Sequence, residues 1–431
     1  MEIVLKIAVL LQFMTTVFAE NQLPKERAIV ESKQPITPSF YNGAIHLSDL
    51  STSAATGGAM YTINAPGRYY IASDLGIAPS NSQVAAIKIT ASNVFLDMNE
   101  ATIYQRTGNS QTGLMGIEVD SSIANVTILN GKINGLNVSD STEQNAGVVI
   151  GSSANNITIE DVVVFGCTSA TNEVAGFLLN SCNNISLINC SANNNTNTLA
   201  TATSDNGTVS GFKLSSSADC ILQNCYANRN ASTDQNGYGF KLTSSTYNKI
   251  LNCTALNQIS TSNDSGDSAV GFYSTDGTGN SFNGCESIGN VGSSSAVASN
   301  GIGFYLAGTE KYSSIINCAA IGNGCAATNT SGVGYGIWMP SGVTYCEIRN
   351  NRLLSNYGYA NSYGIYDDTA TTIANLYVNN FAHGNVNNAG TVNNYAFTVT
   401  FTSSKVSATY NALTNLATAQ GSFYNVDVTK T

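Results

Sequence analysis

The sequence contains few charged residues. Asp, Glu, Lys and Arg make up 10% of the 431 residues, whereas about 25% is usual for a soluble domain. Only 17 residues are Lys or Arg, they form no basic cluster, and the formal net charge is −10. We therefore expect no binding of nucleic acid, which requires basic patches. An acidic polymer is also a poor electrostatic match for such a chain.

The sequence is equally poor in metal-binding patterns. It contains only two His, and its ten Cys include no Cys-x-x-Cys pair. Zinc and copper sites are therefore not expected, and the sequence indicates no cofactor.

Long apolar runs are missing as well. No segment reaches 18 apolar residues, so the sequence predicts no membrane span. An apolar stretch at 7–18 follows Lys6 and ends in Val17-Phe18-Ala19, which matches the small-residue rule for signal-peptide cleavage. We predict a signal peptide over residues 1–19 and a secreted, periplasmic or cell-surface protein.

A repeated dipeptide, glycine followed by a bulky apolar residue, is the strongest signal that is present. It returns at intervals of 28 to 35 residues. The pairs are Gly116-Ile117, Gly147-Val148, Gly176-Phe177, Gly211-Phe212, Gly239-Phe240, Gly271-Phe272, Gly303-Phe304, Gly336-Ile337 and Gly364-Ile365. A period of this length indicates a stacked repeat architecture.

Each repeat contains three short stretches of alternating apolar and polar residues, which are typical of half-buried strands. Turns rich in Asn, Ser, Thr and Gly separate them, and no helical periodicity occurs between them. The lack of helices excludes βαβ winding. Parallel stacking of such coils, about 4.8 Å apart, predicts an all-β parallel β-helix of about ten coils.

Superposing the coils sorts the residues into columns. The position after the glycine predicts a stack of rings in a dry interior, formed by Phe177, Phe212, Phe240, Phe272 and Phe304. A turn column predicts a ladder of hydrogen-bonded side chains; it reads Asn130, Asp161, Asn189, Asn224, Asn252, Gly284, Asn317 and Asn350.

These Asn-capped coils, and the segment Ile89-Thr90-Ala91-Ser92-Asn93-Val94-Phe95-Leu96-Asp97-Met98-Asn99 that leads into them, resemble a known family. They are similar to right-handed parallel β-helix repeat proteins of the pectin-lyase-like superfamily, including NosD-type and carbohydrate-binding/sugar-hydrolase repeats. The resemblance covers residues 61–385 and implies a right-handed, single-stranded helix. Because the superfamily includes lyases, hydrolases, tailspikes, adhesins and proteins without catalysis, it implies no single activity.

The repeat also divides the chain. We expect an irregular lead-in at 20–60, the parallel β-helix at 61–385 and a C-terminal cap at 386–431. The cap is expected to contain a closing strand near 395–401 and a short helix near 406–418. Its first role would be to shield the end of the solenoid from edge pairing, and its second would be oligomerisation.

Five cysteines fall in one column directly after the Asn ladder, namely Cys190, Cys225, Cys253, Cys285 and Cys318. They could form metal-binding thiolates or disulfide staples between coils, or a buried stack of small apolar side chains. In-register parallel neighbours present their Cβ atoms side by side, which is a poor geometry for a disulfide. The buried stack is the favoured interpretation.

Asp367, Asp368 and His383 are the nearest approach to a catalytic cluster. The superfamily's hydrolases combine clustered aspartates with a histidine, and paired carboxylates can divide acid and base duties. However, Asp367 occupies an inward column, and the superfamily's Gly-His-Gly and Arg-Ile-Lys elements do not occur. A polar transition into the cap explains these residues equally well. Asp264 and Asp267 are candidate calcium ligands, but Asp in a loop also simply forms turns.

The outward residue between the two inward positions forms the column that most favours a function. From coil to coil the column reads Lys213, Lys241, Tyr273, Tyr305, Trp338 and Tyr366. An exposed aromatic stripe at ~4.8 Å spacing offers flat apolar faces for sugar rings, with the lysines as charged donors. Cross-strand aromatic packing and protein docking explain the same column.

The leading hypothesis is an exported β-helix that binds a glycan or builds a surface structure without catalysis. Its partner would be a polysaccharide or a surface protein. The alternative is a polysaccharide lyase or glycoside hydrolase acting on an extracellular polysaccharide. The identity of the glycan and the oligomeric state stay open at this point.

Overall fold

The computed structural model describes residues 45–47, 58–139, 146–199, 207–261, 267–293, 299–326, 331–368, 375–391 and 395–397. All of them belong to one compact unit, residues 44–431. The predicted signal peptide, most of the lead-in and the predicted helix near 406–418 lie outside the described residues. Within the described ranges, no helix is long and apolar enough to cross a membrane.

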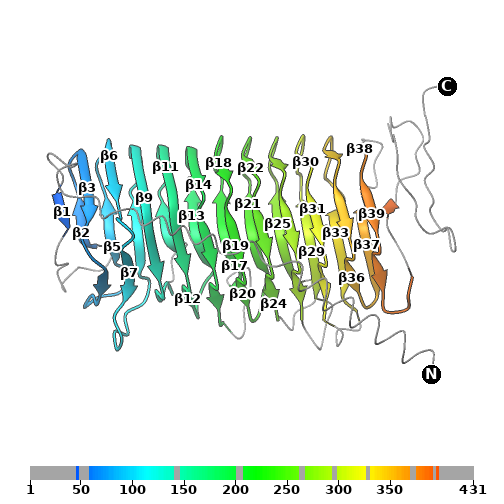
Figure 1. Ribbon diagram of the computed structural model, residues 1–431, viewed down its shortest axis with the longest axis horizontal. Coiled ribbons are helices and arrows are strands. Elements are labelled where there is room, and N and C mark those ends of the chain that lie inside the picture. The colour runs from blue at the N-terminus through cyan, green and yellow to red at the C-terminus, as the bar shows by residue number, and fades with distance from the viewer. Residues whose placement is uncertain are drawn as a thin grey trace. The chain divides into compact units, whose positions relative to one another are not determined.

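Three parallel β-sheets build this unit, and their strands stack along one axis (Figure 1). Sheet 1 contains β2 (Ala59–Ile63), β5 (Ala85–Ile89), β8 (Met115–Val119), β10 (Ala146–Ile150), β13 (Val174–Asn180), β17 (Val209–Ser215), β21 (Gly237–Thr243), β25 (Ser268–Thr275), β29 (Asn300–Ala307), β33 (Val333–Met339), β37 (Asn361–Asp367) and β41 (Tyr395–Phe397).

Sheet 2 has 21 strands because most coils contribute two strands to it, whereas β9 and β11 each run through both positions as one long strand. It contains β1 (Ile45–Leu47), β3 (Gly67–Ile71), β4 (Leu75–Ile77), β6 (Val94–Asp97), β7 (Thr102–Gln105), β9 (Ala124–Asn134), β11 (Asn155–Phe165), β14 (Asn183–Ile188), β15 (Ser191–Asn193), β18 (Ile221–Gln223), β19 (Tyr226–Asn228), β22 (Lys249–Leu251), β23 (Thr254–Leu256), β26 (Ser281–Asn283), β27 (Glu286–Ile288), β30 (Ser314–Ile316), β31 (Ala319–Ile321), β34 (Glu347–Arg349), β35 (Arg352–Leu354), β38 (Leu376–Val378) and β39 (Phe381–His383).

Sheet 3 is built from eight strands of two residues. It contains β12 (Thr168–Ser169), β16 (Thr196–Asn197), β20 (Ala231–Ser232), β24 (Ile259–Ser260), β28 (Val291–Gly292), β32 (Gly324–Cys325), β36 (Tyr357–Gly358) and β40 (Val386–Asn387). The predicted parallel β-helix is therefore confirmed, with one difference. Coils from β12 onward carry a fourth short strand besides the three that the sequence indicates. The expected number of about ten coils compares with 12 strands in sheet 1 and eight in sheet 3.

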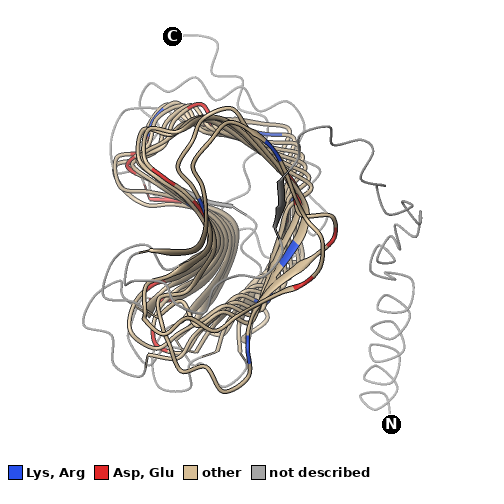
Figure 2. Ribbon diagram, turned by 90° about the vertical axis from the view of Figure 1, so that its left-hand side faces the viewer, with Lys and Arg blue, Asp and Glu red and all other residues tan. Residues whose placement is uncertain are grey.

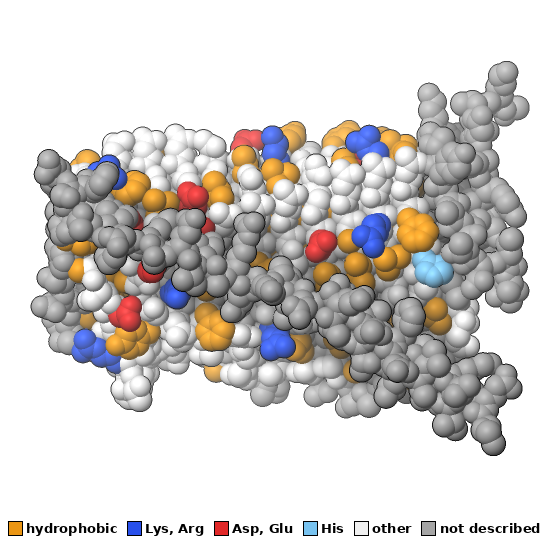
Figure 3. Space-filling view, in the orientation of Figure 1, with side chains coloured by type: hydrophobic (Ala, Val, Ile, Leu, Met, Phe, Trp, Pro, Cys, Tyr) orange, Lys and Arg blue, Asp and Glu red, His pale blue; other side chains and the backbone are white. Residues whose placement is uncertain are grey.

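Seen along its axis, the described part of the unit shows coils that superpose on one another (Figure 2). On the described part of the face in Figure 3, hydrophobic side chains lie among uncharged polar side chains and backbone, and charged side chains are few and scattered. Strands lie on both sides of the expected span 61–385, since β1 pairs with β3 and β41 pairs with β37. Strand β41 forms the first part of the closing strand expected near 395–401.

The predicted phenylalanine stack lies in the interior of sheet 1. Neighbouring rings from Phe177 to Phe304 have centroids 4.8 to 4.9 Å apart and planes within 7° of parallel. All five side chains are buried. Strand register brings each ring over the next, as in the pair Phe212 and Phe240. This confirms that equivalent positions of successive coils lie directly over one another.

Close approach of two sheets explains the glycine that defines the repeat. A Cβ atom at Gly176 would lie 2.7 Å from the Cβ of Ala192 on sheet 2, and one at Gly239 would lie 2.7 Å from the Cβ of Ala255. Such contacts are shorter than van der Waals packing allows. Glycine on one sheet and a small residue on the opposite sheet therefore let the two sheets pack closely.

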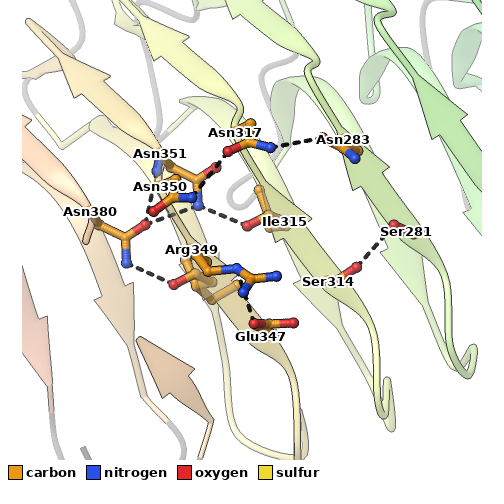
Figure 4. Close-up of polar contacts among 11 residues, drawn as sticks. Ser281, Asn283, Ser314, Ile315, Asn317, Glu347, Arg349, Asn350, Asn351 and Asn380 are labelled. Carbon is orange, nitrogen blue, oxygen red and sulfur yellow. Dashed lines mark hydrogen bonds and ion pairs between the residues drawn. The ribbon is translucent and has the colours of Figure 1, made fainter. Parts of the chain in front are cut away.

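The predicted Asn ladder occupies an exposed turn at which the backbone is left-handed. Asn189 and Asn224 have φ of 52° and 53°, a conformation that Asn tolerates better than most residues. The amide of Asn350 donates to that of Asn317 at 3.2 Å, as Figure 4 shows. The ladder is therefore confirmed, and its backbone geometry explains why Asn recurs there.

A second, buried amide ladder was not anticipated. It consists of Asn195, Asn230, Gln258, Asn290, Asn323, Asn356 and Asn385, of which the last six lie 28 to 35 residues after their predecessors. In the middle of the ladder, both the backbone N–H and the side-chain amide of Asn290 donate to the Oδ1 of Asn323, at 3.2 and 2.6 Å. These side chains satisfy backbone donors at a buried corner, where an unpaired donor would be costly.

All ten cysteines are free and buried, so the interpretation as a buried stack is confirmed and no disulfide joins them. The backbone N–H of Cys225 donates to the sulfur of Cys253 at 3.4 Å. Burial raises the pKa of Cys167 and of Cys346 to about 12, which keeps both protonated at neutral pH. The column is continued by Asn351 and Asn380, whose amides are bonded to each other (Figure 4).

Candidate functional site

The outer face of sheet 1 changes character along the axis. In the N-terminal half its central column carries the ion pair of Lys88 and Glu118, followed by Val149 and Leu178, which are buried. In the C-terminal half strand register places Tyr273, Tyr305, Trp338 and Tyr366 over one another. The predicted column of aromatic residues therefore exists. We call these four residues the aromatic stripe.

The aromatic stripe is half-buried, which corrects the expectation that it is exposed. A second outward column, three residues earlier in each strand, packs beside it and contains Tyr238, Val270, Ile302, Tyr335 and Tyr363. The first four of these side chains are buried. Sequence reasoning missed this column, although its period is the same, because Val270 and Ile302 interrupt its tyrosines.

Trp338 lies at the centre of the resulting aromatic cluster. Its ring stacks on Tyr305 at 4.4 Å and 8°, and on Tyr335 at 4.8 Å and 11°. The indole N–H is shielded from solvent and has no hydrogen-bond acceptor among the described residues, whereas a buried indole N–H usually has one. The two stacking contacts thus fix the Trp338 ring and leave its indole N–H without an acceptor among the described residues.

The two lysines of the column, expected as charged donors, are ion-paired. Glu173 lies directly before β13. Its carboxylate oxygens form ion pairs with the Nζ of Lys213 at 2.5 Å and the Nζ of Lys241 at 3.0 Å. Burial opposes the ionised form of Glu173, but the two lysines lower its pKa to about 2. The Lys241 ammonium also lies 5.0 Å from the ring centre of Tyr238. Glu173 escaped sequence reasoning because it is 40 and 68 residues from its partners.

The structure does not bring the three catalytic candidates into one site. Asp367 ends β37 of sheet 1 and points inward, where its carboxylate accepts hydrogen bonds from Tyr377 and Asn375. Asp368 follows it, and its backbone N–H donates to Met339. His383 is exposed at the end of β39 on sheet 2, with its ring stacked on Phe381.

Of the two calcium candidates, only Asp267 lies among the described residues. Asp267 is buried and accepts a hydrogen bond from the amide of Asn236 at 3.4 Å, so it takes part in a contact between neighbouring coils. Asp264 lies outside the described residues. Within the described residues, no group of three or more His, Cys, Asp or Glu side chains could hold a metal ion.

Comparison with known proteins finds similarity of fold. The chain matches the A-module of the Azotobacter vinelandii mannuronan C-5 epimerase AlgE4 at 16% identity and a TM-score of 0.38, covering 73% of this chain and 86% of that one. It matches an endo-xylogalacturonan hydrolase from Aspergillus tubingensis at 11% and 0.32, covering 79% and 92%. It matches PfbA, a surface adhesin of Streptococcus pneumoniae, at 10% and 0.27, covering 73% and 81%.

The chain is a β-solenoid. No protein-family model matches it, and no curated protein sequence matches it. The identities and TM-scores above are too low for the activities of those proteins to be transferred. The function of this β-solenoid has to be argued from its own surface.

Proposed function

We propose that this β-solenoid binds an extended, uncharged polysaccharide along the C-terminal half of the outer face of sheet 1, without catalysis. The observation that carries the proposal is the aromatic stripe, four aromatic side chains in register on four consecutive coils. We propose further that the protein is exported and acts outside the cell or at its surface, in line with the signal peptide expected at 1–19.

A polymer with a regular repeat suits this surface because the stripe itself repeats. Strands of neighbouring coils lie about 4.8 Å apart, and an extended β-1,4-linked pyranose chain advances by a similar distance per sugar. Because Tyr305 and Trp338 stack on each other, the solvent-accessible edge of each ring, and not its full face, would then meet one sugar. Tyr and Trp combine an apolar ring with a polar group, which matches the apolar faces and hydroxyl groups of sugars.

Charge favours a neutral chain over an acidic one. The protein has a net charge of −10, and Glu173 occupies the two lysines nearest the stripe. An acidic polysaccharide would have to displace Glu173 or remain without a cationic partner there. A neutral chain needs neither.

The test is retention on insoluble cellulose, mannan and xylan. We expect Trp338→Ala to weaken retention about tenfold, equivalent to about 1.4 kcal/mol, and Trp338→Phe to weaken it less because the ring is kept. Phe165→Ala, which removes a ring 44% exposed at the end of β11 on sheet 2, is the matched control. Unchanged retention by Trp338→Ala, together with a large loss of thermal stability, would show that the stripe is architectural.

A polysaccharide lyase or glycoside hydrolase is the second candidate. One observation favours it: an ionised carboxylate, Glu173, and two ammonium groups lie on the same face as the stripe. Incubation with the same polysaccharides, followed by assays for new reducing ends and unsaturated sugars, tests it. Turnover that is abolished by Glu173→Gln or by Asp368→Asn would replace the binding proposal with a catalytic one.

A further inference from the structure

The corner between sheet 1 and sheet 2 carries a column of left-handed residues. One residue per coil has φ between 52° and 68° there. Hydrogen bonds link this corner to the next coil; for example, the backbone N–H of Tyr247 donates to the carbonyl oxygen of Thr278, the residue before Gly279. The column reads Asn93, Asn125, Asn156, Asn184, Asp219, Tyr247, Gly279, Tyr312 and Tyr345.

In the N-terminal half this column has a structural explanation. Asn is the residue other than glycine that best tolerates a left-handed backbone. The amides also bond from coil to coil, from Asn125 to Asn93 at 3.0 Å and from Asn156 to Asn125 at 3.3 Å. Backbone preference and hydrogen bonding therefore both favour Asn at this corner.

In the C-terminal half neither explanation holds. A bulky side chain at positive φ is an outlier in proteins, yet Tyr occurs at three of four consecutive positions. Tyr247, Tyr312 and Tyr345 are 59%, 61% and 50% exposed, the highest values among the large hydrophobic side chains described. Strain and exposure both oppose folding and solubility, which points to selection for a surface property.

The three rings form a row along the axis. Tyr312 and Tyr345 stack at 5.2 Å and 11°. Tyr247 lies against Gly279, since a Cβ at this glycine would be 2.7 Å from the Tyr247 ring. Gly279 therefore leaves room for the ring of Tyr247. The left-handed backbone column continues through Gly279, although this position adds no ring. We call Tyr247, Tyr312 and Tyr345 the tyrosine row.

We propose that the tyrosine row is a second binding track for an extended, uncharged polysaccharide, separate from the aromatic stripe. The proposal takes its ligand class from the proposed function. The row repeats with the coils, like the stripe, and its phenols present both ring surface and hydroxyl groups. The outward residues beside it on sheet 2, such as Lys249 and Ser281, are polar, so the track is one residue wide.

The width of the row argues against a protein partner. A fully buried aromatic side chain covers about 150–250 Å², so three half-exposed rings offer about 300 Å². Stable protein interfaces need about 800 Å² from each partner with an apolar centre. A narrow row flanked by polar residues fits one polymer chain better than a folded protein.

Two tracks on one rod have a consequence for function. A protein with one site retains a single chain, whereas one with two sites binds with avidity and joins two chains. The stripe lies on the face of sheet 1, and the row lies at the corner beyond the ends of its strands. Wild-type protein should therefore bundle polysaccharide fibres as well as bind them.

The double variant Tyr312→Asn/Tyr345→Asn tests the proposal, because it gives the C-terminal corner the residue of the N-terminal corner. We expect it to fold with an unchanged or higher unfolding midpoint, since Asn suits the left-handed backbone. Its affinity for insoluble cellulose, mannan or xylan should fall at least about tenfold, and fibre bundling measured by turbidity should be lost. Tyr104→Asn, which removes a Tyr 38% exposed on β7, is the matched control and should behave as wild type.

Each remaining outcome decides between interpretations. Unchanged affinity and bundling in a folded double variant would overturn the second track. A wild-type dimer that the double variant converts to monomer in sedimentation analysis would also overturn it, in favour of contact between copies. If the double variant lost binding and Trp338→Ala bound as wild type does, the tyrosine row would be the binding track and the aromatic stripe would be refuted. No binding of any polysaccharide by wild type would refute both.

Discussion

The N-terminal and C-terminal halves of the solenoid have the same kind of interior and different surfaces. Inside, Phe177 and Phe212 in one half stack as Phe272 and Phe304 do in the other, at 4.9 and 4.8 Å. Outside, aliphatic side chains on sheet 1 give way to the aromatic stripe, and asparagines at the corner give way to the tyrosine row.

Two surfaces on different parts of the coil thus change at about the same point along the axis. An interior position is confined by the coils before and after it and by the opposite sheet, so its residue type is retained. An outward position is confined mainly from one side, which leaves its residue free to serve binding. The coincidence of both changes favours a common cause in the C-terminal half, namely the proposed ligand.

The strongest way to break this comparison is to interrupt the shared interior. Phe240→Ala removes the middle ring of the stack, between Phe212 and Phe272, and should lower the free energy of unfolding by about 3–5 kcal/mol. Denaturant unfolding measures this. The exposed control Phe165→Ala should stay within about 0.5 kcal/mol. A loss below about 1 kcal/mol for Phe240→Ala would show that the stack does not hold the two halves together.

The buried amide ladder should be almost as important. Asn290→Ala removes the acceptor of the Gln258 backbone N–H, at 2.9 Å, and leaves buried donors unpaired. We expect a loss of about 2–3 kcal/mol in the free energy of unfolding. If thermal and denaturant unfolding of the variant matched wild type, the ladder would be a by-product of composition.

Glu173 pairs with Lys213 and Lys241, which separate the aliphatic part of the outer face of sheet 1 from the aromatic stripe. Glu173→Gln tests what this pairing contributes. The variant leaves two partly buried lysines without a carboxylate, and we expect a loss of about 1–2 kcal/mol at pH 7. The pKa of Glu173 is lowered from 4.5 to about 2, so its contribution is present above pH 4.5 and is lost as the pH falls toward 2.

The pH series supplies the control for that prediction. The stability difference between wild type and Glu173→Gln should be largest at neutral pH and should disappear near pH 2, measured by denaturant unfolding at each pH. A difference that stays constant from pH 7 to pH 3 would mean that the ion pairs with Lys213 and Lys241 do not contribute.

The exposed Asn ladder should show the smallest effect. Asn317→Gly keeps a residue suited to the left-handed turn and removes two solvent-exposed hydrogen bonds, to Asn283 and from Asn350. We expect a change of no more than about 0.5 kcal/mol in the free energy of unfolding. A loss as large as that of Asn290→Ala would remove the distinction between exposed and buried ladders.

Sequence reasoning identified the fold because a repeat makes each coil a comparison for the next. The ring stack at Phe177 to Phe304, the Cys column and the exposed Asn ladder were all readable from spacing. The buried amide ladder was readable in principle, since its members follow the Cys column by five residues, as Asn323 follows Cys318. It was missed because Asn also fills the turns on either side.

The candidate site was predicted less completely. The sequence placed Tyr273 to Tyr366 in one column, but exposure depends on the neighbouring column of Tyr238 and Tyr335, which packs against it. The grouping of Asp367 with His383 rested on their places in neighbouring coils. The structure places Asp367 inside the coil, where Tyr377 and Asn375 bond to it, and His383 on the exposed side of sheet 2.

The sequence by itself determined the period of the chain, the inward or outward position of each column and the strand that each residue faces in the next coil. It could do so because in a one-dimensional stack every coil repeats the contacts of the last. Only the tertiary structure decided which columns come into contact within a coil. Examples are the glycine of sheet 1 packed against alanine on sheet 2, Glu173 paired with two lysines, and the exposed tyrosines of the corner. Those contacts depend on how the three sheets bend toward one another, and turn geometry, which the period does not contain, sets that bending.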